Sequence, residues 1–177
     1  RQTDVLYVAD GNEIYVGKAS SGDPLSSSDS TGFGGGNVND IELDPEDWRT
    51  AYAVTANGVW RTTNAGGSWN EITGSLTKLT DTSPGLRTVE VVPGKGGAPD
   101  RIFVGGKRGI YQTRGGSGKN GWYEFGTDLP NVPVFDLEYA SDTLVAGTLG
   151  RGAWKASRAD FSKIPPVEKT LELNPFG

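Results

Sequence analysis

The chain of 177 residues contains no cysteine and no histidine. Without cysteine it can form no disulfide, no thiolate metal site and no cysteine nucleophile. Without histidine it can build neither a Ser-His-Asp triad nor a histidine-ligated zinc site. Any catalysis would therefore have to use Asp, Glu, Tyr, Lys, Ser or Thr side chains.

Basic charge and long apolar runs are also scarce. Lys and Arg number 17 against 22 Asp and Glu, which gives a net charge of −5. Proteins that bind nucleic acid need a basic face, so we expect no nucleic-acid partner. No apolar run is long enough to cross a bilayer, so we expect no membrane span. The chain starts at Arg1 and lacks Met, which we interpret as a mature product or a piece of a longer protein.

What the sequence does contain is a repeat. Three segments share the pattern polar–aliphatic–Glu–apolar, at residues 40–43, 88–91 and 136–139. Their central residues Ile41, Val89 and Leu137 follow one another at intervals of 48 residues. A period in the forties, with short strands and frequent glycine, is typical of a β-propeller. We therefore expect the repeated segments to be the innermost strands of successive blades.

The repeat predicts an all-β fold: a β-propeller of four-stranded antiparallel blades over residues 1–157. The expected divisions are a partial blade at 1–37, blades at 38–85, 86–133 and 134–157, and an extended tail at 158–177. The Ser/Gly-rich segment 20–37 is predicted to be a mobile loop. About three and a half blades are too few for a closed ring. We expect the ring to be completed by the remaining blades of a longer propeller or by a second copy of the chain; the alternative is a compact ring closed by the tail.

Residues 62–69 fit the Asp-box pattern Ser/Thr-x-Asp/Asn-x-Gly-x-x-Trp. Thr62 fills the first position of the motif, and Asn64 is expected to hold a tight turn by capping backbone N–H groups with its side chain. Gly66 is expected to adopt a conformation that other residues avoid, and Trp69 to fold back over the hairpin. We interpret these four residues as structural.

On this motif and the repeat, the chain resembles the Asp-box (BNR-repeat) propellers. It is similar to the C-terminal blades of bacterial sialidase, xyloglucanase and sortilin-like repeat proteins. The resemblance implies a secreted or cell-surface bacterial protein and no particular activity. The function it favours is a non-catalytic extracellular module for protein or glycan binding, adhesion or assembly. The alternative is a glycoside hydrolase or its C-terminal fragment, although no sialidase arginine triad can be assigned.

Carboxylates recur in one register of the repeat. Glu42, Glu90 and Glu138 occupy equivalent positions, and Asp40 and Asp136 lie two residues earlier, on the same strand face. Several carboxylates in a central channel can bind calcium, the one cofactor we consider. The three Glu residues are also the candidate catalytic acids for glycoside hydrolysis. The third interpretation is that these acids are solvated channel residues or hydrogen-bond partners between blades.

Basic residues occupy equivalent turns on two adjacent blades. Lys107 and Arg108 lie in one turn and Arg151 in the next. Guanidinium groups at such turns can clamp a carboxylate or sulfate, which makes these three residues candidate ligand-binding residues. Trp48, Trp122 and Tyr123 are further candidates, as platforms for sugar rings or as packing between blades.

Overall fold

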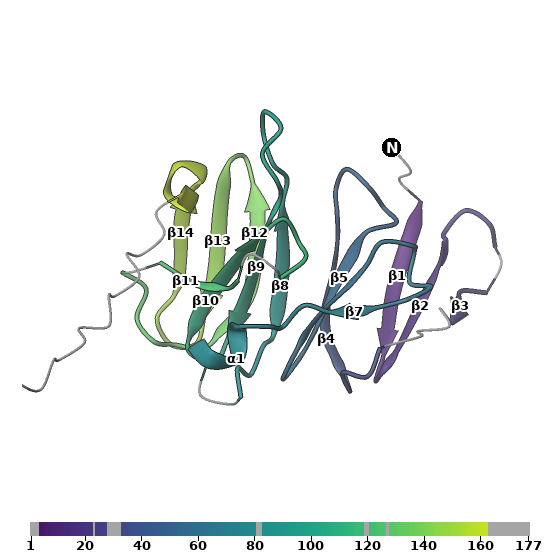
Figure 1. Ribbon diagram of the computed structural model, residues 1–177, viewed down its shortest axis with the longest axis horizontal. Coiled ribbons are helices and arrows are strands. Elements are labelled where there is room, and N and C mark those ends of the chain that lie inside the picture. The colour runs from purple at the N-terminus through teal and green to yellow at the C-terminus, as the bar shows by residue number, and fades with distance from the viewer. Residues whose placement is uncertain are drawn as a thin grey trace, which may run out of the picture.

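The computed structural model describes residues 4–22, 24–27, 33–80, 83–118, 121–126 and 128–162. Four antiparallel sheets stand side by side in chain order, with β1–β3 at one end and β12–β14 at the other (Figure 1). The expected fold class is confirmed: the chain is almost all β and forms part of a propeller. We call the sheets blades one to four.

The strands of each blade follow one another in sequence. Blade one contains β1 (Val5–Asp10), β2 (Glu13–Lys18) and β3 (Ser26–Ser27); blade two contains β4 (Val38–Leu43), β5 (Ala51–Thr55), β6 (Val59–Thr62) and β7 (Asn70–Glu71). Blade three contains β8 (Thr88–Val92), β9 (Arg101–Gly106), β10 (Gly109–Arg114) and β11 (Tyr123–Phe125); blade four contains β12 (Val134–Ala140), β13 (Thr143–Thr148) and β14 (Ala153–Ser157). The innermost strands β4, β8 and β12 are in contact across the blades.

Apolar side chains fill each of the three interfaces between neighbouring blades. Tyr52 and Val54 of blade two pack against Val89 and Tyr111 of blade three. Three phenylalanines dominate the blade three–four interface, where Phe103 lies 5.0 Å from both Phe125 and Phe161 between ring centroids. A third cluster, around Ile14 and Trp69, joins blades one and two. The core is therefore a series of interblade layers rather than one centre.

Three elements differ from the sequence-based expectations. The segment 20–37 was expected to be a loop, but Ser26–Ser27 pairs with β2 as β3. A short helix, α1 (Leu76–Leu79), links blades two and three and buries Leu76. The expected extended tail begins instead with a 3-10 helix, η1 (Arg158–Ser162), because Phe161 is buried against blade three and Asp160 accepts hydrogen bonds from Ser157. The rest of the tail, residues 163–177, lies outside the described residues.

Both end blades expose apolar side chains on their outer faces. On blade one these are Leu6 and Val8, which are 44% and 42% exposed. On blade four this is Val145, which is 40% exposed; the exposed Phe135 lies under the guanidinium of Arg87 from blade three, and the exposed Leu149 lies in the β13–β14 turn. Neighbouring blades cover the corresponding faces inside the stack, so these surfaces mark where the partial ring is open. In the part of the chain that the structure describes, no helix has the length and hydropathy of a membrane span.

Candidate functional site

The repeated carboxylates gather where the innermost strands meet. Glu42 of β4 and Glu90 of β8 are both withdrawn from solvent. The pKa of Glu42 is raised to about 7, chiefly by burial and secondly by the negative charges of Asp40 and Glu138. The pKa of Glu90 is raised to about 8, again chiefly by burial and secondly by the charges of Glu42 and Glu138. Three of the blades thus contribute acids to one electrostatically coupled group.

One of these acids connects neighbouring blades. The Oδ2 atom of Asp40 accepts the backbone N–H of Val89 at 3.0 Å, which joins blade two to blade three. Its Oδ1 atom accepts the N–H of Ile41 at 2.9 Å. Asp40 therefore acts as a hydrogen-bond partner between blades, which is one of the three interpretations drawn from the sequence. Glu90 is only 8% exposed, and the backbone N–H of Tyr139 in blade four partly offsets the rise in its pKa.

The remaining acids of the group have a different environment. Glu138 and Asp136 are exposed on β12, whose outer face is not covered by a further blade. Within the described ranges, no three acidic side chains are arranged to hold a metal ion. Both oxygens of Asp40 already accept backbone N–H groups, so that residue fits calcium poorly. Calcium binding by Asp40, Glu42, Glu90, Asp136 and Glu138 stays a prediction without support from this geometry.

Two adjoining pockets lie beside the outer strands of blades three and four. The first, of about 250 Å³, has an apolar wall and the indole of Trp154, with Asp128, Lys155 and Asp160 among its polar residues. The second, of about 260 Å³, is lined by Arg108, Glu124 and Asn131. Both share an apolar wall, formed by Ile110, Phe125, Gly126 and Leu129. Together they offer an aromatic face and polar groups of both signs.

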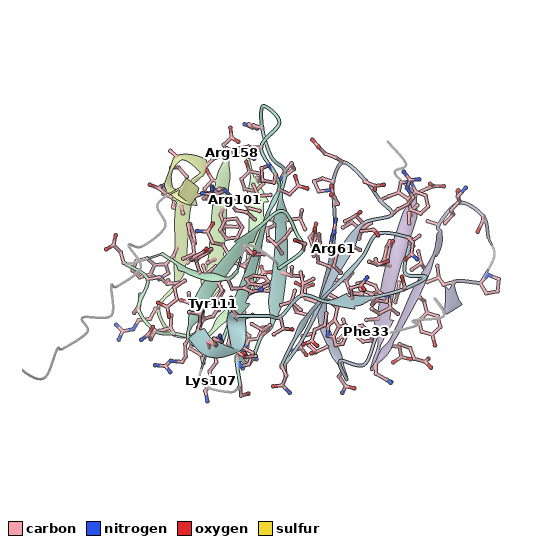
Figure 2. The ribbon with its side chains drawn as sticks, in the orientation of Figure 1. Phe33, Arg61, Arg101, Lys107, Tyr111 and Arg158 are labelled. Atoms are coloured by element: carbon pink, nitrogen blue, oxygen red, sulfur yellow. The ribbon has the colours of Figure 1, made fainter. Side chains whose placement is uncertain are left out.

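The three basic candidate residues have different surroundings in the structure. Arg108 lines the second pocket. Lys107, in the turn between β9 and β10, donates its backbone N–H to Pro84 at 3.0 Å, and Figure 2 shows it at the edge of the molecule. Arg151 lies in the β13–β14 turn, where its carbonyl accepts the indole N–H of Trp154 at 3.1 Å. Of the three, Arg108 lines one of the two pockets described above.

The three aromatic candidate residues differ in how far they are buried. Trp122 is 3% exposed, and its indole N–H donates to the carbonyl of Ile72 at 2.9 Å, which connects blades two and three. It therefore packs between blades and offers no platform for a ligand. Trp48 and Tyr123 are partly exposed. Trp154, which lines the first pocket, was not among the candidate residues named from the sequence.

The Asp-box segment forms a tight turn between β6 and β7. The Oδ1 atom of Asn64 accepts the N–H of Ser68 at 2.9 Å and the hydroxyl of Thr62 at 2.9 Å. The hydroxyl oxygen of Thr62 in turn accepts the N–H of Gly66 at 3.0 Å, and Gly66 has φ +82°. Trp69 is 3% exposed and packs between blades one and two. Each of these four residues therefore has a hydrogen-bond or packing partner within the fold.

Comparison with known proteins identifies the fold and no family. No family model and no curated protein matches the chain. Among solved structures, an ancestral GH74 enzyme matches 88% of this chain at 14% identity and a TM-score of 0.63. YCF48 from Cyanidioschyzon merolae matches 86% at 12% identity and a TM-score of 0.59. The computationally designed Ika8 protein matches 89% at 7% identity and a TM-score of 0.57.

The chain is shorter than each of these structures. It spans 21% of the GH74 enzyme, 52% of YCF48 and 44% of Ika8. The GH74 enzyme and YCF48 are β-propeller proteins, so the likeness supports a partial propeller. At these identities it carries no information on activity.

Proposed function

We propose that this chain is part of a non-catalytic, extracellular β-propeller module that binds a glycan or protein ligand. The observation that carries the proposal is the pair of adjoining pockets at blades three and four. A flat indole next to carboxylates suits a sugar ring, because the ring's apolar face stacks on the aromatic and its hydroxyl groups donate to the acids. This chemistry favours a glycan over a peptide.

The inner-strand acids support a non-catalytic role. Hydrolysis of a glycoside needs two carboxylates that reach the scissile bond. Asp40 is instead engaged by the backbone of the next blade, and Glu90 is only 8% exposed. A secreted or cell-surface location accompanies the proposal, in line with the repeat proteins that the chain resembles.

A binding experiment tests the proposal. Oligosaccharides of different composition would be titrated into the protein by calorimetry, and we expect at least one class to bind. Trp154→Ala should weaken that binding by about tenfold, since loss of an aromatic stacking contact costs on the order of 1–2 kcal/mol. Tyr15→Ala is the control, because Tyr15 is an aromatic residue of β2 in blade one and lines neither pocket. Binding that is equal in the two variants, or no binding by any oligosaccharide while a peptide library binds, would contradict the glycan proposal.

The second candidate function is a glycoside hydrolase, and one observation favours it. The raised pKa values of Glu42, about 7, and Glu90, about 8, leave a protonated carboxyl at neutral pH, as a general acid requires. Release of reducing ends from a polysaccharide panel, abolished by Glu90→Gln or Glu42→Gln with folding intact, would support this function. We expect no turnover by the unaltered chain.

A further inference from the structure

The two carboxylates that line the first pocket come from opposite ends of the outer strands. Asp128 follows β11 and Asp160 follows β14, each soon after the strand ends. β14 is the third strand of blade four, as β10 is of blade three, and β10 is antiparallel to β11. The chain therefore leaves β11 and β14 at opposite ends of the two blades, and Figure 1 shows η1, which contains Asp160, at one of these ends. The pocket thus has an acidic group near each end.

Lys155 also borders this pocket, but it belongs to the opposite face of β14. Trp154 pairs with Ala146, which is buried in the cluster between blades three and four. Lys155 pairs with Val145, which is 40% exposed on the outer face of blade four. Because side chains alternate along a strand, the side chain of Lys155 leaves β14 on the face away from blade three. Its charge therefore offsets that of the pocket carboxylates only weakly.

The indole of Trp154 presents an aromatic surface to the pocket. Its ring is partly buried, and its N–H donates to the carbonyl of Arg151 at 3.1 Å. The polar atom of the indole is thus satisfied within the protein, and the ring face is the part that a ligand can contact. An indole face attracts cations as well as apolar rings, and it does so more strongly than the rings of Tyr or Phe. Together with the acids, it favours a ligand with positive charge and a flat apolar surface.

The charge of the whole chain agrees with a positively charged ligand. A net charge of −5 raises the local concentration of cations and lowers that of anions. The second pocket contains Arg108 and Glu124, one charge of each sign, and so gives no clear preference. Selection for charge is therefore confined to the first pocket.

We propose that the first pocket selects amino glycans, which are oligosaccharides whose sugar rings carry free, protonated amino groups. This inference rests on the proposed glycan-binding function and names the class of glycan. One sugar ring stacks on Trp154, and ammonium groups of the oligosaccharide donate charge-assisted hydrogen bonds to Asp128 and Asp160. An N-acetylated sugar can stack in the same way but carries no charge, so it binds more weakly.

Calorimetric titration of two matched oligosaccharides into the 177-residue chain tests the proposal. One is an oligomer of glucosamine and the other is its N-acetylated form of equal length, both at a mildly acidic pH that keeps the amines protonated. We expect the glucosamine oligomer to bind about tenfold more tightly, since it adds ion pairs and a cation–π contact that are partly exposed to solvent. Added salt should narrow the difference, because it screens exposed charges.

Asp128→Asn separates the effect of charge from that of shape, because the amide has nearly the size of the carboxylate. We expect it to weaken binding of the glucosamine oligomer about threefold, as for loss of an exposed ion pair, and to leave binding of the N-acetylated oligomer unchanged. Asp10→Asn is the matched control, because it removes the same charge from an exposed position in blade one that lines neither pocket. Equal affinities of the two variants for the glucosamine oligomer would overturn the proposal.

The outcomes distinguish this inference from the function on which it rests. Equal binding of the two oligomers, or tighter binding of the N-acetylated form, would overturn selection for charge; if Trp154→Ala weakened both, the glycan site would be retained. Binding of no oligosaccharide would overturn the inference and the proposed function together. Tighter binding of an oligolysine of equal charge would favour a basic peptide as the ligand and overturn the amino-glycan proposal.

Discussion

Asn64 shows how much a single exposed side chain contributes to one hairpin. Its Oδ1 atom accepts two hydrogen bonds within the turn, from Ser68 and Thr62. Asn64→Ala removes this acceptor, and we expect it to lower the free energy of unfolding by about 1 kcal/mol. Asn64→Asp retains the acceptor and should lose much less. Urea denaturation of the two variants measures the difference, and equal midpoints would mean that the turn does not depend on this oxygen.

Glu90 makes stability depend on pH in an unusual direction. A carboxyl whose pKa is raised on folding to about 8, from an ordinary value of 4.5, favours the protonated form in the folded state. Its contribution is complete at low pH and is lost as pH rises from about 4.5 through about 8. Stability should therefore fall over this interval. Thermal unfolding at a series of pH values measures the fall.

Glu90→Gln tests the cause of that pH dependence. The neutral amide imitates the protonated carboxyl and leaves no charge to be buried at pH 8. At pH 8 we expect it to raise Tm by at least about 2–4 °C, the shift that corresponds to roughly 1 kcal/mol in a chain of this size. Glu46→Gln, at an exposed position, should leave Tm unchanged. A Glu90→Gln variant with the parent's slope of Tm against pH would show that Glu90 ionises freely in the folded protein.

At the scale of the element, β9 approaches blade four too closely for a side chain at residue 105. A Cβ atom on Gly105 would lie 2.7 Å from both Thr88 Cγ2 and Val134 Cγ1, and these β-branched neighbours rotate little. Gly105→Ala should therefore destabilise the protein by about 1–3 kcal/mol. Denaturant unfolding measures this loss in the free energy of unfolding, provided that the slope of that free energy against denaturant concentration is the same in the variant and the parent chain.

Gly147 provides a matched control in the next blade. It occupies in β13 the position of Gly105 in β9, but the nearest atom to its added Cβ would be Asp136 Cβ at 3.6 Å. Gly147→Ala should be close to neutral in this chain. Similar losses in both variants would indicate that the strand, and not the neighbouring blade, disfavours alanine.

The elements were predicted well wherever the repeat was regular. Glu42, Glu90 and Glu138 share a register that fixes the innermost strands in sequence. Ser26–Ser27 and η1 were missed, because a two-residue strand and a turn anchored by Phe161 depend on tertiary partners that no local pattern contains. Partners of polar side chains were equally hidden. The alternation of residues along the strand predicts the strand face on which Asp40 lies. The fold is needed to show that its carboxylate accepts the backbone N–H of Val89.

At the scale of the whole molecule, the exposed outer faces of blades one and four predict association. We expect a native mass near twice 18.7 kDa for the isolated chain, as two copies cover these faces. Val8→Lys should shift the mass toward that of one chain, because it places a charge in the contact. Glu46→Lys serves as the exposed control. A single-chain mass for the unaltered protein would instead favour completion of the ring by further blades of a longer polypeptide.

The blade repeat is regular, yet its three interfaces are filled by different side chains: a Tyr/Trp cluster, a phenylalanine cluster and an alanine-rich cluster around Trp69. Each blade is therefore matched to its own neighbours. A gene in which two blades were exchanged would keep every strand and every turn but would set large side chains against large ones and leave voids elsewhere. Duplication of one blade would explain the repeat. Because the side chains at the interfaces now differ, one blade cannot replace another, and we expect the chain to fold only with its blades in their present order.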